Sequence, residues 1–532
     1  MIIQWRQSGR YFSDGGLLSG SFASSSTDEP VRELDLRLEV LLDDVWTDIS
    51  DDLEVAGGLR FRRGVSGNGP MDVVADGGEL SFTLDNSILN EGRTQGWYSP
   101  NHPDCRSGWT YDIGVRLTFT FGALERQHFS GTIRQITPQP GIYGEQRVRV
   151  LAEDLMADLD DFDLREVDIA VDQSEDEVLD AVLDQLPAEV QPASRDFDAG
   201  VDVFPYVFDR IGPDTKMAAV IADAMRSSLG LFAVKGDGTP MFRSRHTRAL
   251  GTSAYTFDEI RNVVIPSSLD AVYRVVRSTT HPKTIDPAPT SVLYALEGRA
   301  PALAPGETIT LWGDYRDSDD NRALIGGLDR VVPIVASTDY EANSQDDGLG
   351  DDATSDLSVS TDDFATTAKF EITNTGAATV YLTKLQIRGK RVLDIGSQTY
   401  QSGVVTDGRT RPFLMDLPMQ SDQFVGQAAA DYVRHQYGDA RTQISQIEYM
   451  ANYSDALMEQ FMEREIGDMV SVTEEQTGLS AVNAVIQSIE VEVSEALIVI
   501  VRYGLAPANP LSVWQWGIVG KSEWGETTVY AF

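Results

Sequence analysis

The sequence predicts a mainly β protein with some α-helix, divided into several domains. Short segments in which apolar and polar residues alternate recur through most of the chain, and Gly, Asp, Asn and Pro separate them. At 532 residues the chain is too long for a single hydrophobic core, and its 42% hydrophobic residues are enough to fill several cores. We therefore expect three or four domains.

Alternating segments fill the first part of the chain and predict a barrel or a sandwich of strands. Asp85 and Asn86 predict a turn that is built by side chains, and Gly131 predicts a close approach within a strand. An acidic stretch at 153–166 closes the unit. The expected strands are residues 34–42, 79–85, 113–121, 129–137 and 146–151.

Helical patterns come next. Ser174, with Glu177 three residues later, predicts a capping box at the start of an amphipathic helix. Residues 216–229 predict a second helix, which we expect to end at Gly230. The chain then predicts a hairpin that turns at Gly236-Asp237-Gly238.

The second half of the chain returns to strands. Residues 290–400 are almost purely β in pattern and predict a compact sandwich without a strong helix. A helix is expected at 422–436, with Asp422 as its N-cap. The first 150 residues and residues 400–505 are expected to share a similar plan, as a distant repeat. The strands expected there are 443–450, 468–473, 482–493 and 496–503.

The charge balance argues against nucleic-acid binding. The chain has 83 acidic and 43 basic residues and a formal net charge of −40. Such a surface repels phosphate and gains nothing from counterion release on DNA. Two explanations stay open. The charge either serves solubility or a saline habitat, or it lines a surface that DNA must pass without sticking.

Other features narrow the class of protein. Cys105 is the single cysteine, so the chain has no internal disulfide and no cysteine metal cluster, and we expect this thiol to be a bystander. No apolar run approaches the roughly 18–20 residues of a membrane helix, so no stable membrane insertion is expected. The N-terminus shows no signal-peptide pattern, and folding in a cytoplasm is expected.

The sequence predicts no catalytic, cofactor-binding or metal-binding residue, and therefore not an enzyme. It carries no GxSxG, Walker or GxGxxG motif, and the run Gly64–Gly69 lacks the Lys and Thr of a phosphate loop. The histidines form no metal motif, and the acidic clusters are better explained as exposed loops than as cation sites. The histidines are His102, His128, His246, His281 and His435. The acidic clusters are Asp160, Asp161 and Asp163; Asp317, Asp319, Asp320 and Asn321; and Asp346, Asp347, Asp351 and Asp352.

The order of segments in the first 160 residues resembles the N-terminal domain of tail-hub and minor tail proteins of tailed bacteriophages. The segments are VWTDISDDLE, GGELSFTLDN, GWYSPNHPDCRSGWTYDIGVRLTF, FSGTIRQI and VRVLAEDLMADL. Later segments also resemble parts of such tail proteins: GETITLWGDYRD, ASTDYEAN, FEITNTGAATVYLTKLQIRGKRV and GIVGKSEWGETTVYAF.

The resemblance implies a baseplate-hub protein, in which two tube-type β-barrel domains per subunit build a trimeric ring of pseudo-sixfold symmetry. It carries over no catalytic residue. The C-terminal segment is rich in Trp and would dock either on a neighbour or on its own domain; its tryptophans are Trp514, Trp516 and Trp524. The implied domains are a first barrel at 1–165, a helical domain at 166–254, a second barrel at 255–289 with 401–505, an inserted sandwich at 290–400 and a docking segment at 506–532.

The implied function is mechanical. A homotrimer at the tail tip of the virion, assembled in the host cytoplasm, would join the six-fold tail tube to a three-fold tip and gate the DNA channel. DNA would pass without specific binding. The implied partners are the distal tail ring, tape-measure, tail tube and fibre or spike proteins. The alternative is a host-surface adhesin that binds or degrades carbohydrate through the 290–400 sandwich. A six-fold tube or distal-ring protein is less favoured, because one barrel per subunit is enough for a hexamer.

Overall fold

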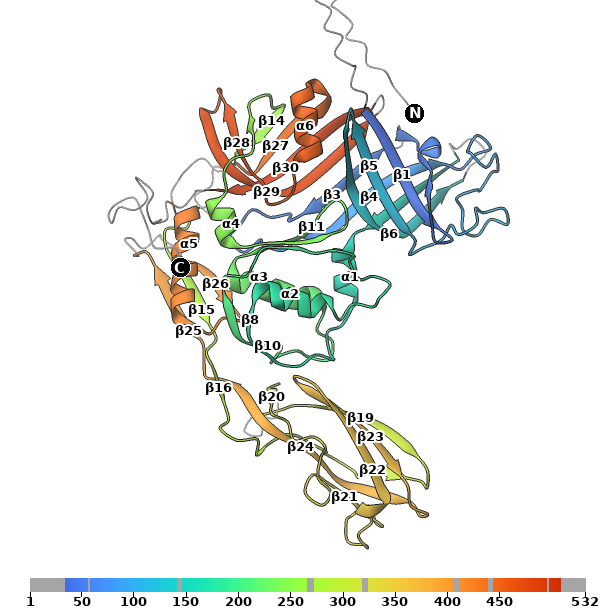
Figure 1. Ribbon diagram of the computed structural model, residues 1–532, viewed down its shortest axis with the longest axis vertical. Helices are drawn as coiled ribbons and strands as arrows, with labels where there is room; N and C mark the ends of the chain where they lie inside the picture. Colours follow the sequence, from blue (N-terminus) through green and yellow to red (C-terminus); the bar gives the residue numbers. More distant parts are fainter. Residues whose placement is uncertain are drawn as a thin grey trace, which may run out of the picture.

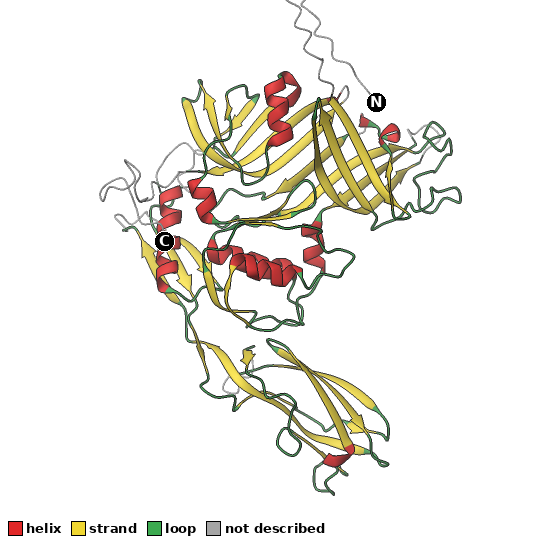
Figure 2. Ribbon diagram, in the orientation of Figure 1, coloured by secondary structure: helices red, strands yellow, loops and turns green. Residues whose placement is uncertain are grey.

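A computed structural model describes residues 34–55, 58–140, 146–265, 272–317, 324–404, 412–438, 444–494 and 497–508. Strands dominate these residues, and the helices are few and short (Figure 2). Three layers follow one another down the long axis: an extended sheet, a helix-containing unit and a β-sandwich (Figure 1). The prediction of a mainly β, multidomain fold with some helix is confirmed. No described helix is long and apolar enough to cross a bilayer.

The largest element is a sheet of 13 strands. Its main path runs β14-β27-β30-β29-β3-β4-β7-β6-β5-β1-β2, and β28 pairs with both β29 and β13. The N-terminal strands are β1 (Leu34–Leu42), β2 (Val45–Asp48), β3 (Leu59–Gly64), β4 (Asp76–Asp85), β5 (Gly114–Phe121), β6 (Leu124–Gln139) and β7 (Arg147–Glu153). The later ones are β13 (Thr256–Phe257), β14 (Asn262–Val264), β27 (Gln446–Met450), β28 (Met469–Glu474), β29 (Leu479–Ser494) and β30 (Ile498–Pro507).

The prediction of two tube-type β-barrel domains needs one correction: no sheet among the described residues is closed into a barrel. Within the described residues the sheet is open, because its path begins at β14 and ends at β2. Strand β3 of the N-terminal part pairs with β29 of the C-terminal part, so the two parts form one continuous sheet. Alternation of apolar and polar residues identifies a half-buried strand, but it does not specify the partner of that strand.

A helix-containing unit lies beneath the sheet. The predicted capping box is present at the start of α2, where Ser174 and Glu177 cap each other's backbone. Helix α3 ends differently from our prediction: Leu229, not Gly230, has the left-handed conformation, with φ of 60°. Position 230 instead requires a residue without a side chain, because a Cβ there would collide with the ring of Phe242. The elements are α1 (Leu155–Asp161), β8 (Ala170–Ser174), α2 (Glu175–Leu183), β9 (Asp196–Phe197), β10 (Val203–Val207), α3 (Met217–Ser228), β11 (Leu231–Val234), β12 (Pro240–Arg243) and α4 (Arg245–Leu250).

A small second sheet with its own helix lies beside this unit. Asp422 caps α5 as predicted, since its carboxylate accepts from the backbone N–H of Phe424 at 2.6 Å. The core of this small unit is separate from that of the large sheet. Its elements are β15 (Val276–Thr280), β25 (Gln398–Ser402), β26 (Phe413–Leu417) and α5 (Gln423–Tyr437).

The sandwich at the far end consists of strands and loops, with one short 3-10 helix at Thr354–Asp356 (Figure 2). Its long strand β24 pairs with five short strands, and β19, β23 and β22 form the second sheet. A separate apolar core fills the space between them. The strands are β16 (Lys283–Ile285), β17 (Ser291–Ala295), β18 (Ala302–Leu303), β19 (Thr308–Asp314), β20 (Gly326–Leu328), β21 (Tyr340–Asn343), β22 (Leu357–Asp363), β23 (Thr367–Asn374) and β24 (Val380–Asp394).

Candidate functional site

Two parts of the large sheet repeat one strand plan. The order β3-β4-β7-β6-β5 in the N-terminal part corresponds to β14-β27-β30-β29-β28 in the C-terminal part. Every neighbouring pair in both series is antiparallel, and both series run through the strands in the same sequence order. The repeat that we predicted between the two ends of the chain is therefore present as strand topology. We call these parts the first and second β units.

The long central strands show how closely the two units correspond. Strands β6 and β29 have 16 residues each, and each pairs with one neighbour through its N-terminal half and with another through its C-terminal half. Both carry a bulge between these halves, after Ile133 and after Ile486. At the bulge in β6, the N–H of Ile133 donates to the carbonyl of Ile113 at 2.9 Å. At the bulge in β29, the N–H of Ile486 donates to the carbonyl of Asp468 at 2.9 Å.

The two units meet at a seam between β3 and β29. Pairing runs from Leu59 opposite Val493 to Gly64 opposite Ser488. Gly64 has a φ of 100°, and a Cβ at this position would collide with the carbonyl oxygen of Gln487. Only glycine fits this close approach, which fixes the end of the seam.

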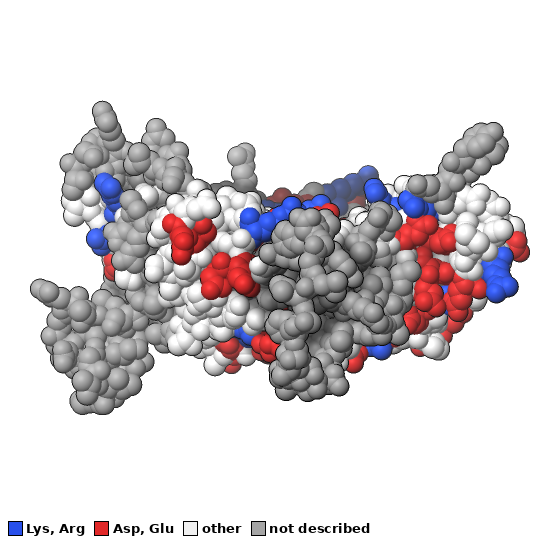
Figure 3. Space-filling view, turned by 90° about the horizontal axis from the view of Figure 1, so that it is seen from above, with Lys and Arg blue, Asp and Glu red and all other residues white. Residues whose placement is uncertain are grey.

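One face of the sheet around the seam is apolar and the other is charged. Phe61, Val491 and Tyr503 belong to the buried face. On the opposite face, Arg60 pairs with Glu490 at 2.6 Å, and Arg502 pairs with both Glu490 at 3.0 Å and Glu448 at 2.7 Å. Seen from above, the acidic side chains form separate groups, and basic side chains lie mainly along one edge of the view (Figure 3).

Beneath the seam lies a buried ionic cluster formed by Arg63, Arg126 and Glu465. Arg63 of β3 is 1% exposed and binds both carboxylate oxygens of Glu465. Arg126 of β6 donates to the same carboxylate at 2.7 Å and to the carbonyl of Met462 at 2.8 Å. Burial alone would raise the pKa of Glu465, but the charge and hydrogen bonds of Arg63, with the charge of Arg126, hold it below its usual value. Glu465 therefore stays ionised and joins the two β units.

Next to this cluster, His128 is enclosed by aromatic rings. It stacks on Phe461 with 4.3 Å between ring centroids, and Phe119 meets it edge-on at 5.3 Å. Neither ring nitrogen of His128 has a hydrogen-bond partner among the described residues. Burial, together with the charges of Arg126 and Arg63, lowers the pKa of His128 well below its usual value. The imidazole is therefore a neutral core residue.

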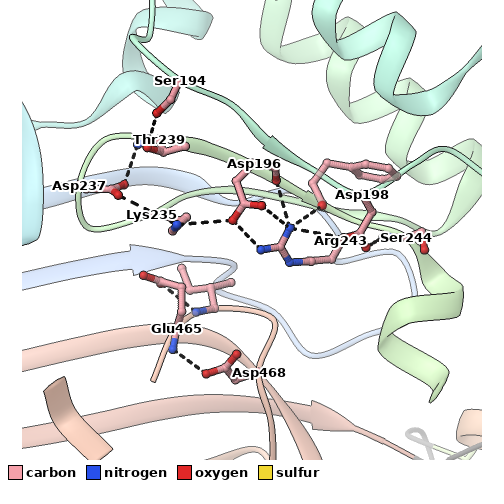
Figure 4. A network of polar contacts seen from close by, with 12 residues as sticks. Ser194, Asp196, Asp198, Lys235, Asp237, Thr239, Arg243, Ser244, Glu465 and Asp468 are labelled. Atoms are coloured by element: carbon pink, nitrogen blue, oxygen red, sulfur yellow. Dashed lines mark hydrogen bonds and ion pairs between the residues drawn. The ribbon is translucent and has the colours of Figure 1, made fainter. Parts of the chain in front are cut away.

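A polar pocket of about 310 Å³ opens where the large sheet meets the helix-containing unit. On one side of it, Asp196 accepts from Arg243 at 2.7 Å and from Lys235 at 3.4 Å (Figure 4). On the other side, the backbone N–H of Glu465 donates to Asp468 at 3.0 Å. The hydrogen bond from Arg243 is the main cause of a lowered pKa at Asp196.

The described lining of this pocket combines cationic side chains with carboxylates. Its cations are Arg126, Lys235, Arg243 and Arg248, and its carboxylates are Asp196, Glu465 and Asp468; neither histidine nor cysteine occurs among its described lining residues. Across the described ranges, no three His, Cys, Asp or Glu side chains are grouped to hold a metal ion. The Asp196 network and the Glu465–Asp468 pair lie on opposite sides of the pocket (Figure 4).

The cysteine and the glycine run singled out in the sequence have structural places. Cys105 is half-buried, and burial raises the pKa of its thiol. In the run from Gly64, Gly69 donates its N–H to Asp72 at 2.8 Å, which closes a turn.

The acidic clusters make local contacts where they are described. Asp163 pairs with Lys216 at 2.7 Å, Asp317 with Arg391 at 3.1 Å and Asp346 with Arg299 at 3.1 Å. Asp319, Asp320 and Asn321 lie outside the described residues, as do Trp514, Trp516 and Trp524.

The structure also contains a helix that we did not predict. Helix α6 (Asp455–Glu463) places Phe461 against His128 and leads directly into Glu465. Ser454 caps its start by accepting from the N–H of Leu457 at 3.3 Å. The signal in the sequence is this cap followed by apolar residues at helical spacing: Leu457, Met458, Phe461 and Met462.

Comparison with known proteins gives structural neighbours only. No family model and no curated protein matches the sequence. The 43 kDa tail protein of prophage MuSo2 from Shewanella oneidensis has 10% identity and a TM-score of 0.47, over 89% of this chain and 98% of that one. A tail protein from Neisseria meningitidis has 9% identity and a TM-score of 0.45, over 88% and 96%.

A third neighbour is the Escherichia coli c3393 protein, described as a component of the type VI secretion system with structural similarity to phage T4 tail proteins gp27 and gp5. It has 10% identity and a TM-score of 0.37, over 89% of this chain and 77% of that one. Two of these neighbours are tail proteins, which is the class that the order of segments in the sequence resembles. At these identities and TM-scores, they carry no conclusion about what this chain does.

Proposed function

We propose that this chain is a structural hub subunit at the tail tip of a tailed bacteriophage. Three copies form a ring that joins a six-fold tail tube to a three-fold tip and gates the DNA channel. The chain supplies binding surfaces and acts without catalysis or a cofactor. Its partners are the distal tail ring, tape-measure, tail tube and fibre or spike proteins.

The observation that carries this proposal is the internal repeat of two β units joined edge to edge. A chain with two like units presents two similar positions, so three chains present six. A head-to-tail contact whose rotation closes yields a ring. Such a ring matches a six-fold neighbour on one side and a three-fold neighbour on the other. The buried ionic cluster of Arg63, Arg126 and Glu465 supports the proposal, because it fixes the two units rigidly to each other.

The charged face of the large sheet is suited to passing DNA without binding it. Three of its arginines are engaged: Arg60 with Glu490, Arg147 with Glu54 and Arg502 with Glu448. Arg149 of β7 is exposed. To bind one of these three arginines, a DNA phosphate would have to displace the carboxylate that already pairs with it. Few counterions would be released, so binding would gain little free energy from this source. A surface that DNA passes without sticking was one of two explanations of the net charge of −40. Paired charges on this face would serve that purpose.

The position of the sandwich supports a role in contacting components other than the ring. It lies at the opposite end of the molecule from the large sheet (Figure 1). Its attachment to the helix-containing unit includes a salt bridge between Lys283 and Asp209 at 2.5 Å and a backbone hydrogen bond from Ala365 to Val167 at 2.7 Å. We assign this domain to contact with a fibre or spike protein.

Localisation on intact particles tests the proposed function. Antibodies raised against the purified chain would be applied to virions of the phage that encodes it and visualised by electron microscopy. We expect label at the tail tip and at no other part of the particle. Label along the tube or on the head, or particles assembled without the chain, would refute the proposal.

A further inference from the structure

Two short chain segments form a neck between the small second sheet and the sandwich. Residues 281–282 lead from β15 into β16, and residues 395–397 lead from β24 into β25. The N–H of Ile395 donates to the carbonyl of Pro282 at 3.1 Å, so the two segments lie side by side (Figure 1). Gly396 has a φ of 104°, and a Cβ placed there would meet no atom within 4 Å beyond its chain neighbours. A glycine in open space gives this neck the freedom of a hinge.

The sandwich also contacts residues 206–211 of the helix-containing unit, a segment that we call the latch. Lys283 of the sandwich donates to Asp209 of the latch at 2.5 Å and to the carbonyl of Tyr206 at 3.2 Å. The side chain of Lys283 is 2% exposed. Gly326 of the sandwich lies so close that a Cβ there would be 2.9 Å from the Cβ of Asp209. A buried ammonium group requires its carboxylate partner, so the latch and the sandwich depend on each other when they are in contact.

Two further polar contacts extend the latch. Thr366 donates through Oγ1 to the carbonyl of Ile211 at 2.5 Å. Arg210 pairs with Asp394, the last residue of β24 before the neck. Among the described strands, none in the sandwich pairs with a strand of another unit. The sandwich is therefore held by side-chain contacts and not by a continuous sheet.

The apolar part of this interface is small. Ala365 and Val392 are buried against the core of the large sheet, and Ile285 and Leu328 are partly buried beside them. The other buried apolar residues of the sandwich form a core of their own. An interface between domains that is neither large nor mainly apolar permits relative motion of the domains.

Phe208, in the middle of the latch, has a strained backbone. Its φ is 69°, a left-handed conformation that bulky residues rarely adopt, and its side chain is buried in the main core. Because the ring is fixed in the core, a change of φ would move the residues that follow it, including Asp209 and Ile211. Strain of this kind persists where surrounding contacts impose it. The contacts that Asp209 and Ile211 make with the sandwich are such contacts.

We propose that the sandwich is a hinged arm with two states. In the docked state, which the structure shows, the latch holds the arm against the helix-containing unit. In the released state the arm turns about the neck, the pair between Lys283 and Asp209 is broken, and Phe208 leaves the left-handed conformation. The inference does not depend on the proposed ring. Under the proposed function, a fibre or spike protein that binds the sandwich selects between the two states.

Distances between two spin labels in the full chain test the two states. In a Cys105→Ser background, Leu349→Cys places one label on the sandwich and Glu189→Cys places the other on the helix-containing unit, both at exposed positions. The test variant adds Lys283→Met, which removes the cation bound by the latch. The matched control adds Lys384→Met, which removes an exposed ion pair within the sandwich. Circular dichroism checks that each variant is folded, and pulsed electron paramagnetic resonance gives the distance distribution.

The shape of the distribution decides between a hinged arm and a fixed domain. The parent and the control should each give one narrow distribution. Lys283→Met should move most spin pairs into a broad distribution, because Asp209 loses its partner and docking is disfavoured. Adding Asp209→Leu should restore most of the narrow component, since an apolar pair can replace a buried ionic one.

Two results would overturn the proposal: a narrow, parent-like distribution for folded Lys283→Met, or a broad distribution for the parent. If Lys283→Met does not fold, Thr366→Val takes its place, because it removes the hydrogen bond to the carbonyl of Ile211 with little change of shape. A broader distribution for Thr366→Val than for the control would then support the hinged arm, and an unchanged one would overturn it.

Discussion

Neutralising Glu465 should loosen the junction between the two β units. The carboxylate is 12% exposed and is the acceptor for Arg63, whose side chain is 1% exposed. Glu465→Gln leaves the buried guanidinium of Arg63 without a counter-ion. Removing one partner of a buried ion pair destabilises a protein by about 3–5 kcal/mol. Arg126 is 22% exposed and keeps its bond to the carbonyl of Met462, so it contributes less to the loss.

Urea denaturation, followed by tryptophan fluorescence, measures this effect as a loss in the free energy of unfolding. The matched control is Glu125→Gln, which removes an exposed pair with Arg37, and it should change stability by about 0–1 kcal/mol. A double variant, Arg63→Met with Glu465→Leu, should recover most of the loss, because apolar replacement of both buried charges is often nearly neutral. If Glu465→Gln behaved like Glu125→Gln, or if the double variant were no better than the single one, the cluster would not hold the junction.

Three further predictions concern pH and domain structure. The pKa of His128 is well below its usual value in the folded chain, so the imidazole stays neutral there. In the unfolded chain the same side chain becomes protonated below about pH 6.5. Stability should therefore fall as the pH drops below that value, and His128→Phe should gain melting temperature relative to the parent from about pH 7.5 to about pH 5.5; parallel curves would contradict this. The pKa of Asp154 is raised to about 7, chiefly by burial, so its stabilising contribution is present at low pH and is lost as the pH rises through 7. Asp154→Asn keeps the cap on α1 and should gain stability relative to the parent between about pH 5 and pH 8, and calorimetry that shows no such change would refute the assignment. Excised residues 281–397 should unfold cooperatively, whereas residues 290–400 should be less stable because they lack β16, which pairs with β24; equal stability of the two segments would contradict this role of β16.

The local elements could be predicted from the sequence because they depend on neighbouring residues. Apolar and polar residues alternate from Leu34 to Val40, and β1 has the predicted bounds of 34–42. Asp422 and the Ser174–Glu177 pair satisfy the free backbone donors at the starts of their helices, as their positions predicted. Gly131 lies where predicted, against the carbonyl of Glu153, where a Cβ would not fit.

The candidate site could not be predicted because it joins residues that are far apart in the chain. Arg63 and Glu465 are 402 positions apart, and each looks like an ordinary surface charge in its own segment. Barrel closure failed as a prediction for the same reason, since the pairing of β3 with β29 is set by tertiary contact. Helix α6 has only nine residues between strands, so its short apolar pattern did not stand out.

The symmetry of the isolated assembly tests the central claim most directly. Native mass spectrometry of the full chain, followed by electron-microscopic averaging down the ring axis, gives both the number of copies and their arrangement. We predict a mass of three times the 58.4 kDa chain and a closed ring with three-fold symmetry and six similar lobes. A chain that remains single at high concentration, or a stable hexamer, would contradict the account.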